Sequence, residues 1–229
     1  MGFIPTSIKV SKTTNLVCLF FKWLKPTGLI FLSFGLWIQT PTAKANRGKE
    51  LFRLCVKCHG SAGEGQQQLS APAIAGMPEW YLTDQLKKFK SGIRGNHAKD
   101  FPGLKMRPIA KMLRYKGDIE AVAKYVSGLK LVKPPQTITD GDAAIGATLY
   151  QNCISCHGSK GEGMQPLNSP PLVGQSDWYL MTQLHNFKNG LRGADSEKDP
   201  NGSLMVSMAN TLADKKAMRD VLAHIYTLQ

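Results

Sequence analysis

The sequence predicts an all-α protein made of two similar domains that follow a leader. Residues 55–95 align without gaps on residues 153–193, and 22 of these 41 positions are identical. An offset of 98 residues is the size of a domain, so the pattern indicates a duplicated domain and not an array of short repeats. Helical spacing supports the fold class, because Ile119, Val122, Ala123 and Val126 recur at i, i+3, i+4 and i+7, and no stretch alternates like a strand.

The first 45 residues predict a secretory signal peptide. Residues 1–27 are basic and contain no Asp or Glu, residues 28–38 are apolar, and Ala43-Lys44-Ala45 fits a small-x-small cleavage site. An uncleaved anchor is the alternative, but the apolar run is shorter than the roughly 20 residues of a membrane-spanning helix. We therefore expect cleavage after Ala45 and a periplasmic mature protein.

Composition and net charge limit the classes of partner that the protein is expected to bind. The chain is 42% hydrophobic and carries a formal net charge of +13, as a foldable and basic protein does. Without residues 1–45, 24 basic residues face 16 acidic ones, a net charge of +8. This moderate excess argues against nucleic acid and favours acidic protein partners, with peripheral association at a membrane surface as a further option.

The domain boundaries are predicted from the repeat and from a proline pair. Pro134-Pro135 stops a helix and extends the chain, so we expect a first domain at 46–132, a linker at 133–139 and a second domain at 140–229. Asp118 and Asp214 suit helix N-caps. The expected helices are 47–58, 79–91 and 118–127, and 142–156, 177–189 and 214–228.

Each copy of the repeat contains one CxxCH motif, which is typical of covalent haem c attachment. Cysteines three residues apart lie on one helix face and can form thioethers to the haem vinyl groups, and the adjacent His ligates the iron. Cys18 lies in the leader, so the two motifs use all the other cysteines. The predicted thioether and iron-ligating residues are Cys55, Cys58 and His59 for haem 1, and Cys153, Cys156 and His157 for haem 2.

The same cysteines could serve three other purposes. These are a dithiol redox pair, a zinc site and two disulfides that staple an exported protein. None of them explains why a His follows the second Cys in both copies.

The second axial ligand of each iron must recur in both copies. Met106 and Met205 do, each with Ala at +4 and Leu at +7, whereas the neighbouring Met112 and Met208 do not. Thioether ligation favours ferrous iron and raises the potential. His97, His185 and His224 have no counterparts in the repeat and are expected to be ordinary surface or core residues. His97 is a minor ligand candidate, because it lies on the same expected loop as Met106.

Taken together, these motifs resemble the cytochrome c4 family of dihaem cytochromes, which have two class I cytochrome c domains. The likeness covers residues 46–229 and includes P-x-[IL]-x-G, W-Y-L-x-x-Q-L-x-x-F-K-x-G-[IL]-R-G and M-x-x-x-A-x-x-L in both halves. It implies that each domain wraps a few helices around its haem and that a Pro carbonyl orients each proximal His. The residues it implies are Pro72 and Pro170 behind the histidines, and Arg94, Arg192, Trp80 and Trp178 near the haem propionates.

The resemblance implies an electron-transfer protein and not an enzyme. The donor would be a quinol-oxidising complex or another cytochrome, and the acceptor a terminal oxidase. A haem-bearing subunit of a dehydrogenase complex is the alternative. A dihaem peroxidase is a further one, which would need an open iron and a nearby acid or base.

Overall fold

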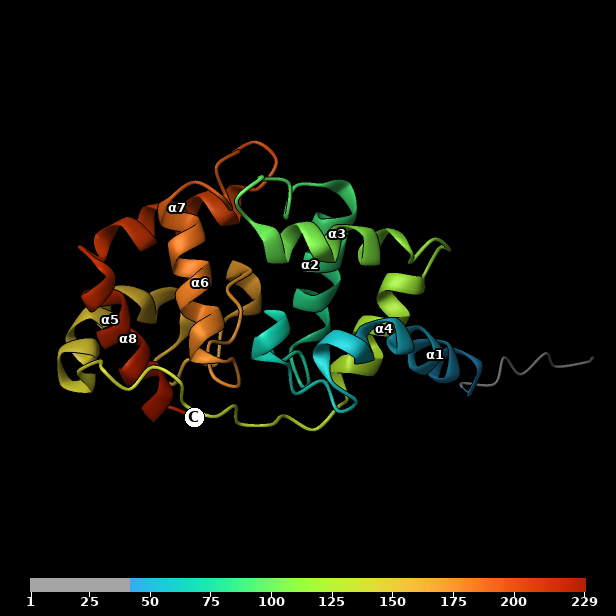
Figure 1. Cartoon of the computed structure of the whole chain (residues 1–229), viewed down its shortest axis with the longest axis horizontal. Helices are drawn as coiled ribbons and strands as arrows, with labels where there is room; N and C mark the ends of the chain where they lie inside the picture. Colours follow the sequence, from blue (N-terminus) through green and yellow to red (C-terminus); the bar gives the residue numbers. More distant parts are fainter. Residues whose placement is uncertain (1–41) are drawn as a thin grey trace, which may run out of the picture. The chain divides into compact units, whose positions relative to one another are not determined.

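The computed structural model describes residues 42–229, and this part of the chain is helical apart from its loops and two isolated bridges (Figure 1). The predicted leader lies outside the described residues, except that residues 42–45 begin the first helix. Between residues 42 and 229, no helix is both long enough and apolar enough to cross a membrane.

Four α-helices and one 3-10 helix make up each half in the same order. The first half contains α1 Thr42–His59, η1 Gln67–Leu69, α2 Glu79–Ser91, α3 Phe101–Lys111 and α4 Asp118–Ser127. The second half contains α5 Ala143–His157, η2 Gln165–Leu167, α6 Asp177–Lys188, α7 Pro200–Thr211 and α8 Lys215–Thr227. The prediction of two all-α units of related sequence is confirmed.

The methionine-bearing segments are helices, not the loops that the sequence analysis expected. Asp100 accepts a hydrogen bond from the Gly103 N–H at the start of α3, and Asp199 accepts one from the Gly202 N–H at the start of α7. A Pro follows in the first turn of each helix, where its missing N–H costs nothing. The Gly and Pro content of these segments predicts loops. They are helical because their caps and tertiary contacts stabilise such short helices.

The first and last helices of each half pack across each other (Figure 1). Gly48 of α1 faces the Ala121 carbonyl of α4, and Gly146 of α5 faces the Asp220 carbonyl of α8; a Cβ at either glycine would overlap that carbonyl. The glycines therefore allow the helices to approach closely. The predicted apolar face of α4 is confirmed, because Ile119, Val122, Ala123 and Val126 are all buried.

One predicted helix cap is wrong and the other is confirmed. Gly117 is the N-cap of α4, and Asp118 is its first residue. The buried Asp118 carboxylate instead accepts hydrogen bonds from the Tyr115 N–H and from Arg47 on α1. Asp214 does cap α8, since its carboxylate accepts from the Ala217 N–H.

Candidate haem-binding sites

Each half of the molecule encloses a cavity between its CxxCH helix and its methionine helix. The cavity of the first half measures about 220 Å³ and is lined by Cys55, Cys58, His59 and Met106. The cavity of the second half measures about 130 Å³ and is lined by residues that include Cys153, His157 and Met205. Tertiary packing thus brings the histidine of each CxxCH motif and the methionine predicted for the same haem to one cavity.

The first histidine is held in the orientation that an iron ligand needs. His59 is the last residue of α1, is only 6% exposed, and donates from Nδ1 to the Pro72 carbonyl at 2.8 Å. Burial lowers the pKa of His59, although the hydrogen bond to Pro72 opposes this, so the ring is neutral at pH 7. With its proton on Nδ1, the ring offers its Nε2 lone pair as a ligand.

The second histidine repeats this arrangement. His157 ends α5 and donates from Nδ1 to the Pro170 carbonyl at 2.8 Å, and burial lowers its pKa as well. The two prolines therefore occupy the positions that the family resemblance implied.

The cysteines are free thiols on the last turns of α1 and α5, beside these histidines. Burial, together with the neighbouring Cys58, raises the pKa of Cys55 to about 11. The pKa of Cys153 is raised in the same way by burial and by Cys156. A reactive dithiol pair needs lowered thiol pKa values, so these environments do not suit that alternative.

The methionines differ between the two cavities. In the first half Met106 lines the cavity, whereas Met112 does not line it and is 47% exposed. In the second half both Met205 and Met208 line the cavity. The internal repeat therefore remains the argument that favours Met205.

The residues present fit a covalently attached haem. Each cavity has an oriented imidazole on its CxxCH helix and a thioether on its methionine helix. Cys55 and Cys58 both line the first cavity, whereas in the second Cys153 lines the cavity and Cys156 lies beside it on α5 without lining it. Most of the remaining lining is apolar, with Leu54, Leu82 and Phe89 in the first cavity and Leu180, Leu184 and Phe187 in the second. Two thioether-forming cysteines, one His and one sulfur ligand are the donor set of a low-spin haem c.

The two cavities share a polar wall that lies between the domains. Tyr81 and Gln85 of α2, and Tyr179 and Gln183 of α6, line both cavities. Each pair is related by the repeat, because 81 matches 179 and 85 matches 183. The two halves therefore meet through the same helix face, as in an isologous interface.

The arginines that the resemblance implied complete this wall. Arg94 donates to Gln85 at 2.7 Å, to Gln183 at 3.1 Å and to the Tyr179 hydroxyl at 2.8 Å. Arg192 mirrors it, donating to Gln183 at 2.7 Å and to Gln85 at 2.9 Å. Arg94 also lines the first cavity and Arg192 the second.

The two tryptophans that the resemblance implied differ in whether they line a cavity. Trp178 lines the cavity of the opposite half, while the matching Trp80 lines neither cavity. Sequence reasoning did not single out Tyr81, Gln85, Tyr179 or Gln183. Their identity in both copies of W-Y-L-x-x-Q-L was the signal that could have found them.

This fold, with a CxxCH helix, a Pro-oriented His and a facing Met in each half, defines a two-domain c-type cytochrome. The sequence model of the cytochrome c family matches residues 45–130 and again residues 143–229. The chain belongs to the cytochrome c family, with two CxxCH haem c sites and His and Met axial ligands.

Within this family, the chain is similar to two kinds of named protein. The thiosulfate dehydrogenase electron acceptor of Thiomonas intermedia is 37% identical over 62% of this chain, which spans 65% of that protein's length. Cytochrome c4 of Azotobacter vinelandii is 30% identical over 79% of this chain and 87% of its own length. The chain is thus a dihaem cytochrome c similar to both.

Two solved structures share the fold. Reduced cytochrome c4 of Pseudomonas stutzeri superimposes with a TM-score of 0.62 at 25% identity, covering 81% of this chain and 98% of that one. The thiosulfate dehydrogenase TsdBA of Marichromatium purpuratum gives 0.64 at 29% identity, but this chain covers only 40% of it.

Proposed function

We propose that this dihaem cytochrome is a periplasmic carrier that accepts electrons from a thiosulfate dehydrogenase and delivers them to a terminal oxidase. That it carries electrons follows from its family; the donor, the acceptor and the compartment are the proposal. The mature chain would begin after Ala45, with cytochrome domains at 46–132 and 140–229. N-terminal sequencing of the exported protein tests the cleavage site, and a mature chain that begins at Met1 would overturn it.

The shared wall is the observation that supports a two-centre relay. Tyr81, Gln85, Tyr179 and Gln183 border both cavities, so the two haem sites share the same side chains as a common wall. When bound, each haem supplies a reversible one-electron centre. Arg94 and Arg192 face this layer from either side, where we propose that they hold the haem propionates.

The axial residues support transfer over catalysis. His59 and His157 would each ligate one iron, and we propose Met106 and Met205 as the second ligands. A sulfur ligand on each iron would leave no open position for peroxide.

The donor is proposed from two relatives. The Thiomonas protein is named as an electron acceptor of thiosulfate dehydrogenase, and TsdBA is itself a thiosulfate dehydrogenase that contains a region with this fold. A quinol-oxidising complex or another cytochrome, as expected from the c4 resemblance, would be the donor if this proposal fails.

The test is stopped-flow reduction of the oxidised protein by a purified thiosulfate dehydrogenase in the presence of thiosulfate. We expect two haems per chain to be reduced, and subsequent reoxidation by terminal-oxidase membranes. Reduction by a quinol-oxidising complex but not by the dehydrogenase would overturn the donor. Turnover of hydrogen peroxide with a high-spin spectrum would overturn the carrier function.

A further inference from the structure

The two halves differ strongly in charge despite their common origin. Residues 46–132 contain 16 Lys and Arg against 7 Asp and Glu, a net charge of +9. Residues 140–229 contain 7 Lys and Arg against 9 Asp and Glu, a net charge of −2. The basic character of the mature chain therefore belongs almost entirely to the first domain.

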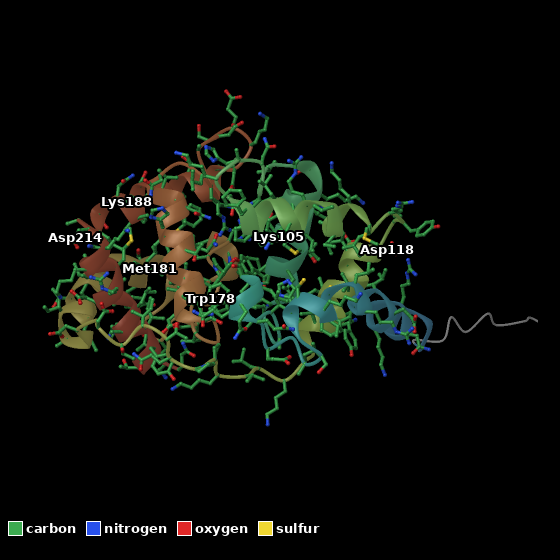
Figure 2. All side chains as sticks on the ribbon, in the orientation of Figure 1. Lys105, Asp118, Trp178, Met181, Lys188 and Asp214 are labelled. Carbon is green, nitrogen blue, oxygen red and sulfur yellow. The ribbon has the colours of Figure 1, made fainter. Side chains whose placement is uncertain are left out.

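Part of this difference lies at the mouth of the haem cavity. Of the residues that line the first cavity, the exposed ones are Cys58, Leu69 and Lys105. Lys57 precedes Cys58 and is exposed as well. These four residues, which we call rim 1, include two cations and one large apolar side chain. Figure 2 shows Lys105 on α3, the helix that carries Met106.

The repeat supplies a matched rim in the second domain. The residues at the corresponding positions, which we call rim 2, are Ser155, Cys156, Leu167 and Leu204. Rim 2 has no charge, and its leucines are 47% and 66% exposed.

The contrast between the rims continues beyond them. Lys111, on the exposed stripe of α3, is matched by Asn210 on α7.

The acidic residues near the rims do not cancel this contrast. Glu64 follows the first CxxCH motif and accepts from the Ala62 N–H, and Glu162 does the same with the Lys160 N–H. Lys160 is a basic residue of the second domain whose counterpart in the first domain is Ala62. Its charge is offset by Glu162, which lies two residues further along the chain. Rim 1 is therefore a cationic surface and rim 2 a neutral, apolar one.

We propose that rim 1 is the docking surface for an acidic redox protein, so that electrons exchanged with that partner pass through haem 1, whereas rim 2 does not bind acidic partners. The proposal rests on the function proposed above and deepens it by assigning one haem to one kind of partner. Lysines around an apolar contact steer an acidic surface to this rim and leave the contact weak enough for release.

A protein partner is favoured over an anionic membrane by where the charges lie. Lys105 itself lines the first cavity, and the exposed Lys57 directly precedes Cys58, which also lines it. A protein partner bound at rim 1 would come close to the redox centre and could exchange electrons with it. A lipid surface bound there would cover the site but could not accept an electron. Binding of rim 1 to an anionic membrane would be revealed by the vesicle measurement below.

The experiment exchanges residues between the two rims of the full holoprotein. The variant Lys57→Ser/Lys105→Leu gives rim 1 the residues of rim 2, and Ser155→Lys/Leu204→Lys does the reverse. Lys116→Ser/Lys124→Leu removes the same charge from exposed positions that do not line the cavity. Binding of poly-L-glutamate is measured by calorimetry and by NMR, with vesicles rich in phosphatidylglycerol as the second probe.

We expect Lys57→Ser/Lys105→Leu to weaken poly-L-glutamate binding about three- to tenfold, and the control to change it less than about twofold. The reverse exchange should create a second binding site, with NMR shifts around haem 2. Lys57→Gln/Lys105→Gln should reproduce the loss, which keeps the test valid if the first variant binds haem poorly.

Three results would overturn the proposal. They are an equal loss of binding in the control, NMR shifts of the wild type centred on rim 2, and an effect of the rim exchange on vesicle binding alone. A redox titration of the same samples separates this from the proposed function. If thiosulfate dehydrogenase reduces both haems but nothing binds at rim 1, the docking proposal is wrong and the proposed function still holds.

Discussion

Lys88 of α2 forms an ion pair with Asp199, the N-cap residue of α7, at 2.9 Å across the boundary between the two domains. The repeat places Asn186 and Asp100 at the matching positions, where the Asn186 amide lies 3.4 Å from the Asp100 carboxylate. A cation therefore faces the buried cap of the helix that carries Met205, and a neutral amide faces the cap of the helix that carries Met106. The two sites have different electrostatic surroundings although their ligands match.

Replacing this cation should change one haem more than the other. Lys88 and Asp199 both line the second cavity, so Lys88→Asn should stabilise the oxidised form of haem 2 and lower its potential by roughly 20–60 mV. Asn186→Lys is the matched control and should raise the potential of haem 1. Spectroelectrochemical titration with haem-resolved NMR measures both, and equal shifts at the two haems would contradict the interpretation.

The methionine of the first domain can be tested against a neighbour that does not line the cavity. Met106→Ala should abolish the absorption band of His/Met ligation at haem 1 and lower its potential, because a thioether ligand raises it. Met112→Ala should leave the spectrum unchanged, since Met112 does not line the cavity. Optical spectra of the oxidised protein decide between them.

In the second domain the comparison is stricter, because both candidate methionines line the cavity. Met205→Ala should remove the His/Met signature of haem 2, and Met208→Ala should retain it while lowering stability. The opposite outcome would transfer the ligand role to Met208. Magnetic circular dichroism of the two variants distinguishes these results.

Asp220 of α8 should make the second domain sensitive to acid. Its buried carboxylate accepts hydrogen bonds from the Asp142 N–H at 2.8 Å and from Lys216, and these hold the pKa of Asp220 below its ordinary value. A carboxyl group with a lowered folded-state pKa stabilises the fold above its unfolded pKa of about 3.9 and loses that contribution as the pH falls through the folded value.

We therefore expect Asp220→Asn to lower the Tm by roughly 4–8 °C at pH 7, and by progressively less below about pH 4. Asp195→Asn is the control, because its partner Lys198 lies on the surface, where such pairs contribute little. Thermal unfolding of both variants between neutral and acidic pH provides the measurement. A Tm difference that grows on acidification would contradict the sign.

Gly95 should be the least replaceable glycine near the first haem site. Its φ of +70° favours glycine, and a Cβ would overlap the Gly103 carbonyl in the first turn of α3. Gly95→Ala should cost about 3 kcal/mol or more, because the helix that carries Met106 must shift.

Gly117→Ala is the control, since Gly117 also has a positive φ but a Cβ there would meet nothing within 4 Å. Its cost should be about 1 kcal/mol, from backbone strain alone. Urea unfolding of the holoproteins gives both values, and equal costs would show that the close approach to α3 does not matter.

Much of the fold and of each site could be predicted because the relevant signals are local. Two cysteines and a histidine within five residues define a haem c site wherever the helix lies, and Ile119, Val122, Ala123 and Val126 mark a buried face by spacing alone. The helices α3 and α7 were not predicted, because caps and tertiary contacts stabilise them and neither is visible as a local pattern. The Asp118 error has a similar cause, since its carboxylate serves Arg47, which is 71 residues away in sequence.

The sequence by itself determined the number of domains, the haem attachment residues and the pairing of Met106 with Met205, because duplication writes each feature twice at a constant offset. Only the tertiary structure decided that Met112 stands apart from its cavity and that Arg94 donates to the Tyr179 hydroxyl of the other domain. It alone also showed that Lys105 lines the first cavity. These relationships join segments distant in sequence, and they depend on how two folded copies pack against each other, which no local pattern encodes.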